Sequence, residues 1–160
     1  MIKAAVITVS DKGSQGLRED LSGPLAIKLL EEISIKVVKY LILPDERDQI
    51  STTLKILCDN NEANLIITTG GTGLAPRDIT PEATLDILER QAPGIAEVIR
   101  LKSLEKTPKA MLSRAVAGIR KSTLIINLPG SPKAVQESLE VILPVLPQAI
   151  EILTSTSFEH

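Results

Sequence analysis

Histidine and cysteine are almost absent from this chain of 160 residues. The only histidine is the last residue, His160, and the only cysteine is Cys58. We therefore expect no Ser-His-Asp or Cys-His catalytic arrangement and no histidine-based zinc site within one chain, and neither an intrachain disulfide nor a thiolate metal cluster can form. The sequence predicts a site that works without imidazole, a reducing compartment, and a Cys58 that packs as a small core hydrophobe.

Aromatic residues are nearly as scarce, since the chain has one tyrosine, one phenylalanine and no tryptophan. This removes the stacking platforms with which many proteins bind single-stranded nucleic acid. The 18 Lys and Arg residues are offset by 20 Asp and Glu residues, and a formal net charge of -2 gives no general attraction to nucleic acid or to an anionic membrane surface. We expect neither partner, so a local site must bind any anion.

Long apolar runs are also missing. No stretch approaches the roughly 18 to 20 residues that a membrane-spanning helix needs. Residues 1–10 are a short apolar run without a small-residue cleavage site, which predicts a strand rather than a signal peptide. We expect a cytoplasmic protein with one domain over residues 1–160, because 43% hydrophobic and 24% charged residues are ordinary for a globular domain of this length.

Strand-like and helix-like segments alternate along the chain, which predicts an α/β domain. Strands are predicted at residues 2–10, 35–43, 65–68 and 123–128, the third of them apolar enough to be a central strand covered on both faces. Helices are predicted after the loop 11–16, around 50–57, at 80–88, at 93–104, from 131 to the stop at Pro144, and from 146 onward. Thr80 and Ser131 are predicted N-caps, each followed by a proline.

Polar loops follow the predicted strands. They span residues 10–13, 44–46, 69–80 and 127–133. Because ligands bind at the carboxyl ends of the strands in open parallel sheets, we expect these four loops to meet at one crevice.

A candidate phosphate loop follows the third strand and comprises Thr69, Gly70, Gly71, Thr72 and Gly73. Its glycines leave backbone amides uncovered, so an anion can approach closely, and its threonine hydroxyls add donors. It is neither a Walker A loop nor the dinucleotide-binding glycine pattern. Taken alone, a glycine cluster after a strand is equally typical of a tight turn.

Two carboxylates stand near this loop in the sequence. Asp78 lies shortly before the helix at 80–88, and such a carboxylate suits a Mg²⁺ ion held against a bound phosphate. The alternative for Asp78 is a favourable interaction with the helix dipole. Asp45 follows another strand, where Pro44-Asp45-Glu46 would by itself indicate only a turn.

Two further loops are candidates for anion binding. Pro129, Gly130, Ser131 and Lys133 combine a turn, a helix N-terminus and a positive side chain, although plain capping by Ser131 with a solvated Lys133 explains the same pattern. Ser10 and Asp11 form a weaker candidate, for which a strand end and a turn would be sufficient explanation.

Together these motifs resemble the molybdopterin adenylyltransferase family of the Mog and MoaB type. The likeness rests on residues 68–73, continuing through 77–84, together with Ser10-Asp11, Pro44-Asp45 and residues 127–133. The motifs occur in family order and spacing between about residues 6 and 153. Each motif is common, but their combination is specific.

The resemblance implies a three-layer α/β/α sandwich with a mostly parallel central sheet, usually assembled as a homotrimer and sometimes as a hexamer. It implies an enzyme that uses ATP and Mg²⁺ to transfer AMP to the phosphate of molybdopterin, with release of pyrophosphate. The product would be handed over to a molybdate-inserting enzyme, whose additional domains we do not expect in this chain.

The resemblance also implies roles for the candidate residues. Asp45 and Asp78 would be the catalytic carboxylates and the Mg²⁺ ligands. The loop at 69–73 would hold the phosphates of ATP, and Ser131 with Lys133 would help to hold molybdopterin. The predicted binding set is completed by Ser10, Asp11, Pro129 and Gly130.

Three alternatives compete with this interpretation. The first is a weakly active or non-catalytic MoaB-like relative or scaffold that binds molybdopterin, against which the presence of both Asp45 and Asp78 argues. The second is a nucleotide pyrophosphatase like the competence-damage proteins, against which residues 129–133 argue. The third is a trimerisation module with Ile95, Val98 and Ile99 buried between subunits.

Overall fold

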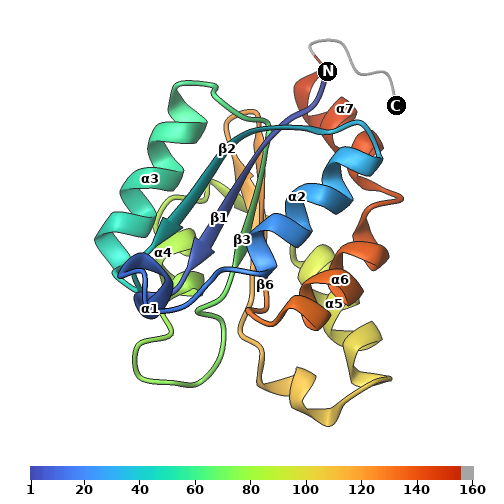
Figure 1. Cartoon of the computed structure of the whole chain (residues 1–160). Coiled ribbons are helices and arrows are strands. Elements are labelled where there is room, and N and C mark those ends of the chain that lie inside the picture. Colours follow the sequence, from blue (N-terminus) through green and yellow to red (C-terminus); the bar gives the residue numbers. More distant parts are fainter. Residues whose placement is uncertain (156–160) are drawn as a thin grey trace.

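A six-stranded sheet forms the centre of the molecule in the computed structural model, which describes residues 1–155 (Figure 1). The strands are β1 (Lys3–Val9), β2 (Lys36–Leu43), β3 (Leu65–Thr69), β4 (Arg90–Gln91), β5 (Ala117–Arg120) and β6 (Thr123–Leu128). They lie in the order β2-β1-β3-β6-β5-β4. Strands β2, β1, β3 and β6 are parallel, β5 is antiparallel to β6, and β4 is antiparallel to β5.

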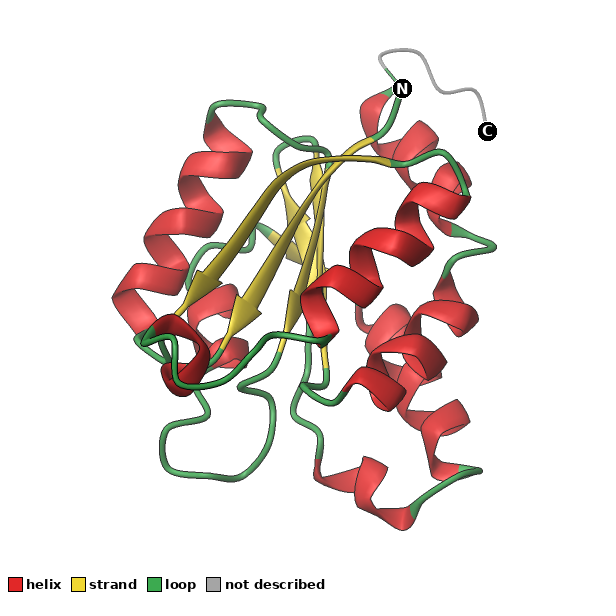
Figure 2. Ribbon diagram, viewed as in Figure 1, coloured by secondary structure: helices red, strands yellow, loops and turns green. Residues whose placement is uncertain are grey.

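Helices cover both faces of the sheet, as Figure 2 shows. They are α1 (Asp11–Ser14), α2 (Ser22–Glu32), α3 (Arg47–Asp59), α4 (Thr80–Leu85), α5 (Pro93–Leu104), the 3-10 helix η1 (Pro108–Leu112), α6 (Pro132–Ile142) and α7 (Leu146–Thr154). Helices α3 and α4 lie on one side, and α2, α5, α6 and α7 lie on the other (Figure 1). Within residues 1–155, none of the helices has the length and hydrophobicity that crossing a bilayer requires.

The two faces of the central strands belong to two hydrophobic cores. In β1, Val6 packs with residues of α2, α5, α6 and α7, whereas Ile7 packs with residues of α3 and α4. This alternation follows from the two-residue repeat of a strand. Every residue of β3 is buried, as predicted for a central strand. The three-layer α/β/α architecture with its mostly parallel sheet is thereby confirmed.

Cys58 also lies in the core, as predicted. It is 2% exposed and packs on the α3 side of the sheet. Burial raises the pKa of its thiol to about 11, so the side chain stays neutral and behaves as a small apolar group. His160 and Phe158 lie outside the described residues, as does the end of the domain expected over residues 1–160.

Several local predictions were wrong or incomplete. The N-cap of α4 is Ile79 rather than Thr80, which is the first helical residue and donates its hydroxyl to the carbonyl of Gly70 at 2.9 Å. The helix also ends at Leu85, earlier than predicted. By contrast, Ser131 is the N-cap of α6, and its Oγ accepts from the amide of Ala134 at 3.2 Å, which confirms the predicted cap.

The trimerisation module required Ile99 to be buried between subunits. Instead, Ile99 is 5% exposed within its own chain and belongs to that chain's core. Ile95 is partly buried against the same core, and Val98 is 44% exposed. Of these three side chains, only Val98 is therefore well exposed for contact with another chain.

The connections between strands create a crevice at one edge of the sheet. Helix α2 connects β1 to β2 across one face, and α3 connects β2 to β3 across the other (Figure 1). The winding direction therefore reverses between β1 and β3. In open α/β sheets, ligands bind beyond the carboxyl ends of the strands at such a switch point.

Candidate active site

A cavity of about 560 Å³ lies at the carboxyl ends of the parallel strands. Eight of the predicted site residues line it: Ser10, Asp45, Thr69, Gly70, Gly71, Asp78, Gly130 and Ser131. The predicted residues that do not line it are Asp11, Thr72, Gly73, Pro129 and Lys133. The structure thus brings four loops from distant parts of the sequence to one site.

Gly70 and Gly71 need to be glycine for two reasons. Their φ angles are +91° and +70°, in the left-handed region that favours glycine. A β-carbon on Gly70 would also lie 2.4 Å from the carbonyl oxygen of Val9, and one on Gly71 would lie 2.2 Å from Oγ1 of Thr80. The chain therefore turns tightly here against β1 and α4.

The turn leaves backbone amides unused. The amide of Gly70 donates to the carbonyl of Leu128 at 3.1 Å. Within residues 1–155, the amides of Gly71, Thr72 and Gly73 donate to no protein atom. Consecutive free amides that follow a strand are suited to holding phosphate oxygens. From the sequence, residues 69–73 could be either a tight turn or a phosphate-binding loop. In the structure the same residues form a tight turn and leave amides free for a phosphate.

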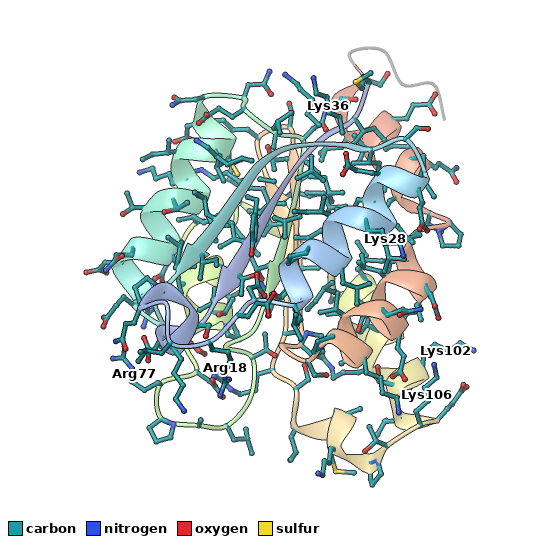
Figure 3. All side chains as sticks on the ribbon, viewed as in Figure 1. Arg18, Lys28, Lys36, Arg77, Lys102 and Lys106 are labelled. Carbon is teal, nitrogen blue, oxygen red and sulfur yellow. The ribbon has the colours of Figure 1, made fainter. Side chains whose placement is uncertain are left out.

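Asp45 and Asp11 hold each other in place. The amide of Asp11 donates to Oδ2 of Asp45 at 3.0 Å, and the amide of Asp45 donates to Oδ1 of Asp11 at 2.9 Å. Arg77 forms a two-pronged ion pair with Asp11, with both contacts at 3.0 Å. Its guanidinium lowers the pKa of Asp11, which therefore stays ionised beside the site. Arg77 and Arg18 both lie at this edge of the molecule (Figure 3).

The carboxylate of Asp45 faces the cavity in a less favourable setting. Burial is the main cause that raises its pKa, and the negative charges of Asp11 and Asp78 raise it further. Asp78 accepts the amide of Ala75 on Oδ2 at 3.0 Å, and a β-carbon on Gly73 would lie 2.9 Å from that oxygen. Two carboxylates thus approach the same loop.

This pair fits a Mg²⁺ ion better than it fits an all-protein metal site. In the described part of the chain, neither Asp45 nor Asp78 forms an ion pair with Lys or Arg, and no cluster of three or more His, Cys, Asp or Glu side chains could hold a metal. Mg²⁺ commonly takes one or two carboxylates and completes its shell with water and substrate phosphates. Asp45, Asp78 and a phosphate on the neighbouring amides could supply such a shell.

The opposite wall of the cavity is formed by the loop before α6. Ser22 donates its hydroxyl to the carbonyl of Gly130 at 2.6 Å. Gly130 packs against Gly70, since a β-carbon on it would lie 3.3 Å from the Cα atom of Gly70. The amides of Gly130 and Ser131 donate to no atom of residues 1–155, so this wall offers a second place for an anion.

The model of a family described as "Probable molybdopterin binding domain" matches residues 5–148. The chain belongs to this family. A Helicobacter pylori (strain ATCC 700392 / 26695) protein named molybdopterin adenylyltransferase is 44% identical over 154 residues, which cover 95% of this chain and 88% of that protein. A Haemophilus influenzae protein of the same name is 44% identical over 142 residues, 88% of this chain and 72% of that protein.

Solved structures agree with the assignment to the molybdopterin-binding family. The molybdopterin biosynthesis enzyme MoaB from Thermus thermophilus superposes with a TM-score of 0.92 at 48% identity, covering 99% of this chain and 100% of that one. The resemblance to the Mog and MoaB type is therefore confirmed.

Sequence reasoning missed one whole wall of this molybdopterin-binding domain, the segment 18–22 that leads into the start of α2. Oδ2 of Asp20 accepts the hydroxyl of Thr8 at 2.6 Å and the hydroxyl of Tyr40. Oδ1 accepts the amides of Ser22 and Gly23 at 3.1 and 3.2 Å. Burial, followed by the hydrogen bond to Asp20, raises the pKa of Tyr40, so its phenol remains a donor. An aspartate two residues before Ser22-Gly23-Pro24 is a helix-start signal that could have located this segment.

Arg114 was missed as well, and no local pattern marks it. Its guanidinium donates to the carbonyls of Gly73 and Asp78, both at 2.8 Å, and pairs with Glu82 at 2.5 Å. These partners are distant in sequence, so only the folded chain of this molybdopterin-binding family member reveals the contact.

Proposed function

We propose that this chain is a molybdopterin adenylyltransferase, which transfers AMP from ATP to the phosphate of molybdopterin and releases pyrophosphate. The observation that carries the proposal is the juxtaposition, in one cavity, of Gly71, whose amide is unused, with the carboxylates of Asp45 and Asp78. Relatives named for this activity are 44% identical over nearly the whole chain. A nucleotidyltransferase of this kind has ATP as its adenylyl donor.

The nucleotide is proposed to lie against residues 69–73. The amides of Gly71, Thr72 and Gly73 would donate to phosphate oxygens, and Thr69 lines the same cavity wall. Preorganised amides stabilise charge on a phosphoryl group without having to reorganise during the reaction. The tight turn at Gly70 and Gly71 therefore has a function as well as a structural cause.

Asp45 and Asp78 are proposed as the ligands of Mg²⁺. The bound ion would neutralise charge on the phosphates during transfer. Without it, both carboxylates would repel the triphosphate that the neighbouring amides attract. Asp11 would act through Asp45, because the reciprocal hydrogen bonds between these residues fix the position of the Asp45 carboxylate.

Molybdopterin is proposed to bind at the opposite wall, where Gly130 and Ser131 present free amides and Ser10 lies nearby. Pro129 shapes the turn, and Lys133 would add a positive charge from the first turn of α6. A phosphate monoester has its second pKa near about 6, so it is already largely a dianion at neutral pH. Attack of its oxygen on the α-phosphorus of ATP needs no general base, which suits a site built without histidine.

We further propose that the chain works as a homotrimer in the cytoplasm, that residues 1–160 form one molybdopterin-binding domain, and that the product passes to a molybdate-inserting enzyme. A set of exposed apolar side chains on α5 and η1 supports assembly: Val98, Leu101, Leu104, Met111 and Leu112. An adenylylated phosphate contains an activated phosphoric anhydride linkage, which supports a role ahead of a second enzyme.

The direct test incubates the purified chain with ATP, Mg²⁺ and molybdopterin, and measures adenylylated pterin and pyrophosphate. We expect both products in equal amounts, with Asp78→Asn lower by about 10²-fold or more. Absence of product from the wild type, or equal product from Asp78→Asn, would overturn the proposal. Binding of molybdopterin without turnover would instead support the non-catalytic relative or scaffold.

A further inference from the structure

Arg114 contacts the β3–α4 loop (residues 70–79) near both of its ends. It lies between η1 and β5, outside the lining of the cavity. Its backbone amide donates to the carbonyl of Thr72 at 2.8 Å, and its Nε donates to the carbonyl of Gly73 at 2.8 Å. Its Nη2 donates to the carbonyl of Asp78, also at 2.8 Å. One residue therefore joins the start of the loop to its end.

The loop has little other support at its tip. Figure 1 shows it extending beyond the carboxyl edge of the sheet, between β3 and α4. Leu74, at this tip, is 64% exposed and so contributes little packing. Arg77 ties the loop to Asp11 and Glu46, which links it to α1 and to the residue before α3 rather than linking its two ends to each other. The two ends of the loop are joined by Arg114 and by the hydrogen bonds of Thr80 to the carbonyls of Gly70 and Gly71.

The separation of Gly73 and Asp78 decides where the Asp78 carboxylate points. Its Oδ2 lies so close to Gly73 that a β-carbon there would be 2.9 Å away. The same oxygen accepts the amide of Ala75. Because the guanidinium of Arg114 bonds the carbonyls of Gly73 and Asp78 together, it fixes this separation without touching the carboxylate.

Arg114 is itself held from the other side. Nη1 of Arg100, on α5, donates to the carbonyls of Ser113 and Ala115 at 3.3 and 2.9 Å. These residues flank Arg114 in the chain. Glu82, in the first turn of α4, pairs with the guanidinium, and this hydrogen bond is the main cause that lowers the pKa of Glu82. The fork is thus oriented before any ligand binds.

We propose that Arg114 is a positioning residue for adenylyl transfer: it sets the Asp78 carboxylate and the free amides of residues 71–73 for Mg²⁺ and ATP. The proposal rests on the proposed function. A lysine could keep the ion pair with Glu82, but its single ammonium group lacks the planar fork that reaches two carbonyls in fixed directions. Arginine and lysine therefore differ at this position even though their charge is equal.

The test compares R114K with two control variants, E82Q and R120K. E82Q removes the charge of the ion pair, but its amide oxygen keeps an acceptor for Nη1 that orients the fork, and the carbonyl contacts remain. R120K disrupts a comparable fork, on Asp59 and the carbonyl of Ile87, away from the cavity. Loss of a residue that orients a metal ligand typically costs about 10–100-fold in metal affinity or activity. We expect R114K to lower kcat and the calorimetric affinity for Mg²⁺ with ATP by such a factor, with the KM for molybdopterin unchanged.

Hydrogen exchange provides a readout that does not depend on turnover. We expect faster exchange in R114K confined to amides of residues 70–80, with E82Q and R120K close to wild type in that segment. The proposal is contradicted if R114K matches wild type in kcat and affinity, if R120K shows the same losses, or if R114K does not fold, since Arg114 would then be a general structural residue. If the wild type makes no product, the proposed function fails, while the affinity and exchange comparisons still decide the role of Arg114.

Discussion

At the scale of single residues, the site combines groups that the fold stabilises with groups that it does not. Gly70 and Gly71 have conformations and neighbours that exclude other side chains, and Asp11 is ionised beside Arg77. Asp45 is held among negative charges with a raised pKa. Strained or electrostatically unfavourable groups are retained where function needs them. The proposed metal ligands are therefore the residues at which stability and activity should conflict.

Asp45→Asn should stabilise the chain while reducing activity. The raised pKa means that ionisation of Asp45 is less favourable in the folded than in the unfolded chain. Below the unfolded pKa, Asp45 is protonated in both states and costs the folded chain nothing. As the pH rises through the folded pKa, its ionisation lowers the free energy of unfolding. The gain from Asp45→Asn is therefore absent at low pH and complete at neutral pH. We expect a gain on the order of 1 kcal/mol in urea unfolding at about pH 7. A loss of stability at that pH would contradict this assignment.

Gly71→Ala should disrupt the site more than its size suggests. The new β-carbon would lie 2.2 Å from Oγ1 of Thr80 at a φ of +70°, so the turn or α4 must shift. We expect a cost of about 1–3 kcal/mol in thermal unfolding together with weaker ATP binding. Gly94→Ala is the matched control, because a β-carbon at Gly94 would meet no atom within 4 Å. Equal effects of the two substitutions would show that the turn is not the cause.

At the scale of secondary structure, the sequence patterns were informative wherever local chemistry determines an element. The long helices, the buried strands β1, β3 and β6 and the edge strand β2 were predicted from periodicity and β-branched runs. Strands β4 and β5 were not, because they have two and four residues and exist through pairing with each other and with β6. Thr80 shows the same limit. Threonine is a common N-cap, but here its hydroxyl donates to the carbonyl of Gly70 at the other end of the loop.

The candidate site was likewise predictable only where a short segment of sequence marks it. Its glycine and aspartate motifs could be found because each is short and lies within one loop. The roles of Asp20 and Arg114 could not be predicted from sequence, because they depend on contacts with Tyr40 and Gly73, which are distant in the chain. The convergence of the loops was predictable because parallel strands place their carboxyl ends at one edge.

Ser131 allows capping and ligand binding to be separated within one element. Ser131→Ala removes the cap of α6 and should cost about 1 kcal/mol of unfolding free energy. Ser131→Asn keeps a capping oxygen and should cost much less. If the side chain also contacts molybdopterin, both variants should raise the KM for molybdopterin. An unchanged KM in Ser131→Asn would leave capping as its only role.

At the scale of the whole molecule, the chain separates a catalytic edge from an apolar surface. The cavity lies at the carboxyl ends of the strands, whereas the exposed apolar side chains named above belong to α5, which packs in one helical layer, and to η1. Large exposed apolar patches commonly mark an interface, and these side chains are the basis of the proposed one. Arg100 and Arg114 connect α5 to the β3–α4 loop, so the proposed interface on α5 would be physically linked to the site.

Sedimentation should therefore show a species of three times the 17.2 kDa chain mass. Leu101→Glu places a charge on the α5 surface, where Leu101 is 64% exposed, and should shift the population toward the monomer. Ile56→Glu is the control, because Ile56 is 49% exposed on α3, on the other side of the sheet. A monomeric wild type, or an unaffected trimer in Leu101→Glu, would contradict an interface on α5.

The proposed site contains no histidine and would transfer AMP from ATP to molybdopterin in one step. A single-turnover reaction with ATP labelled at the α-phosphorus tests this transfer. We expect the label to appear on molybdopterin as pyrophosphate is released, transfer to need Mg²⁺, and no labelled protein to accumulate. Label bound covalently to the protein, or AMP released while molybdopterin remains unlabelled, would contradict it.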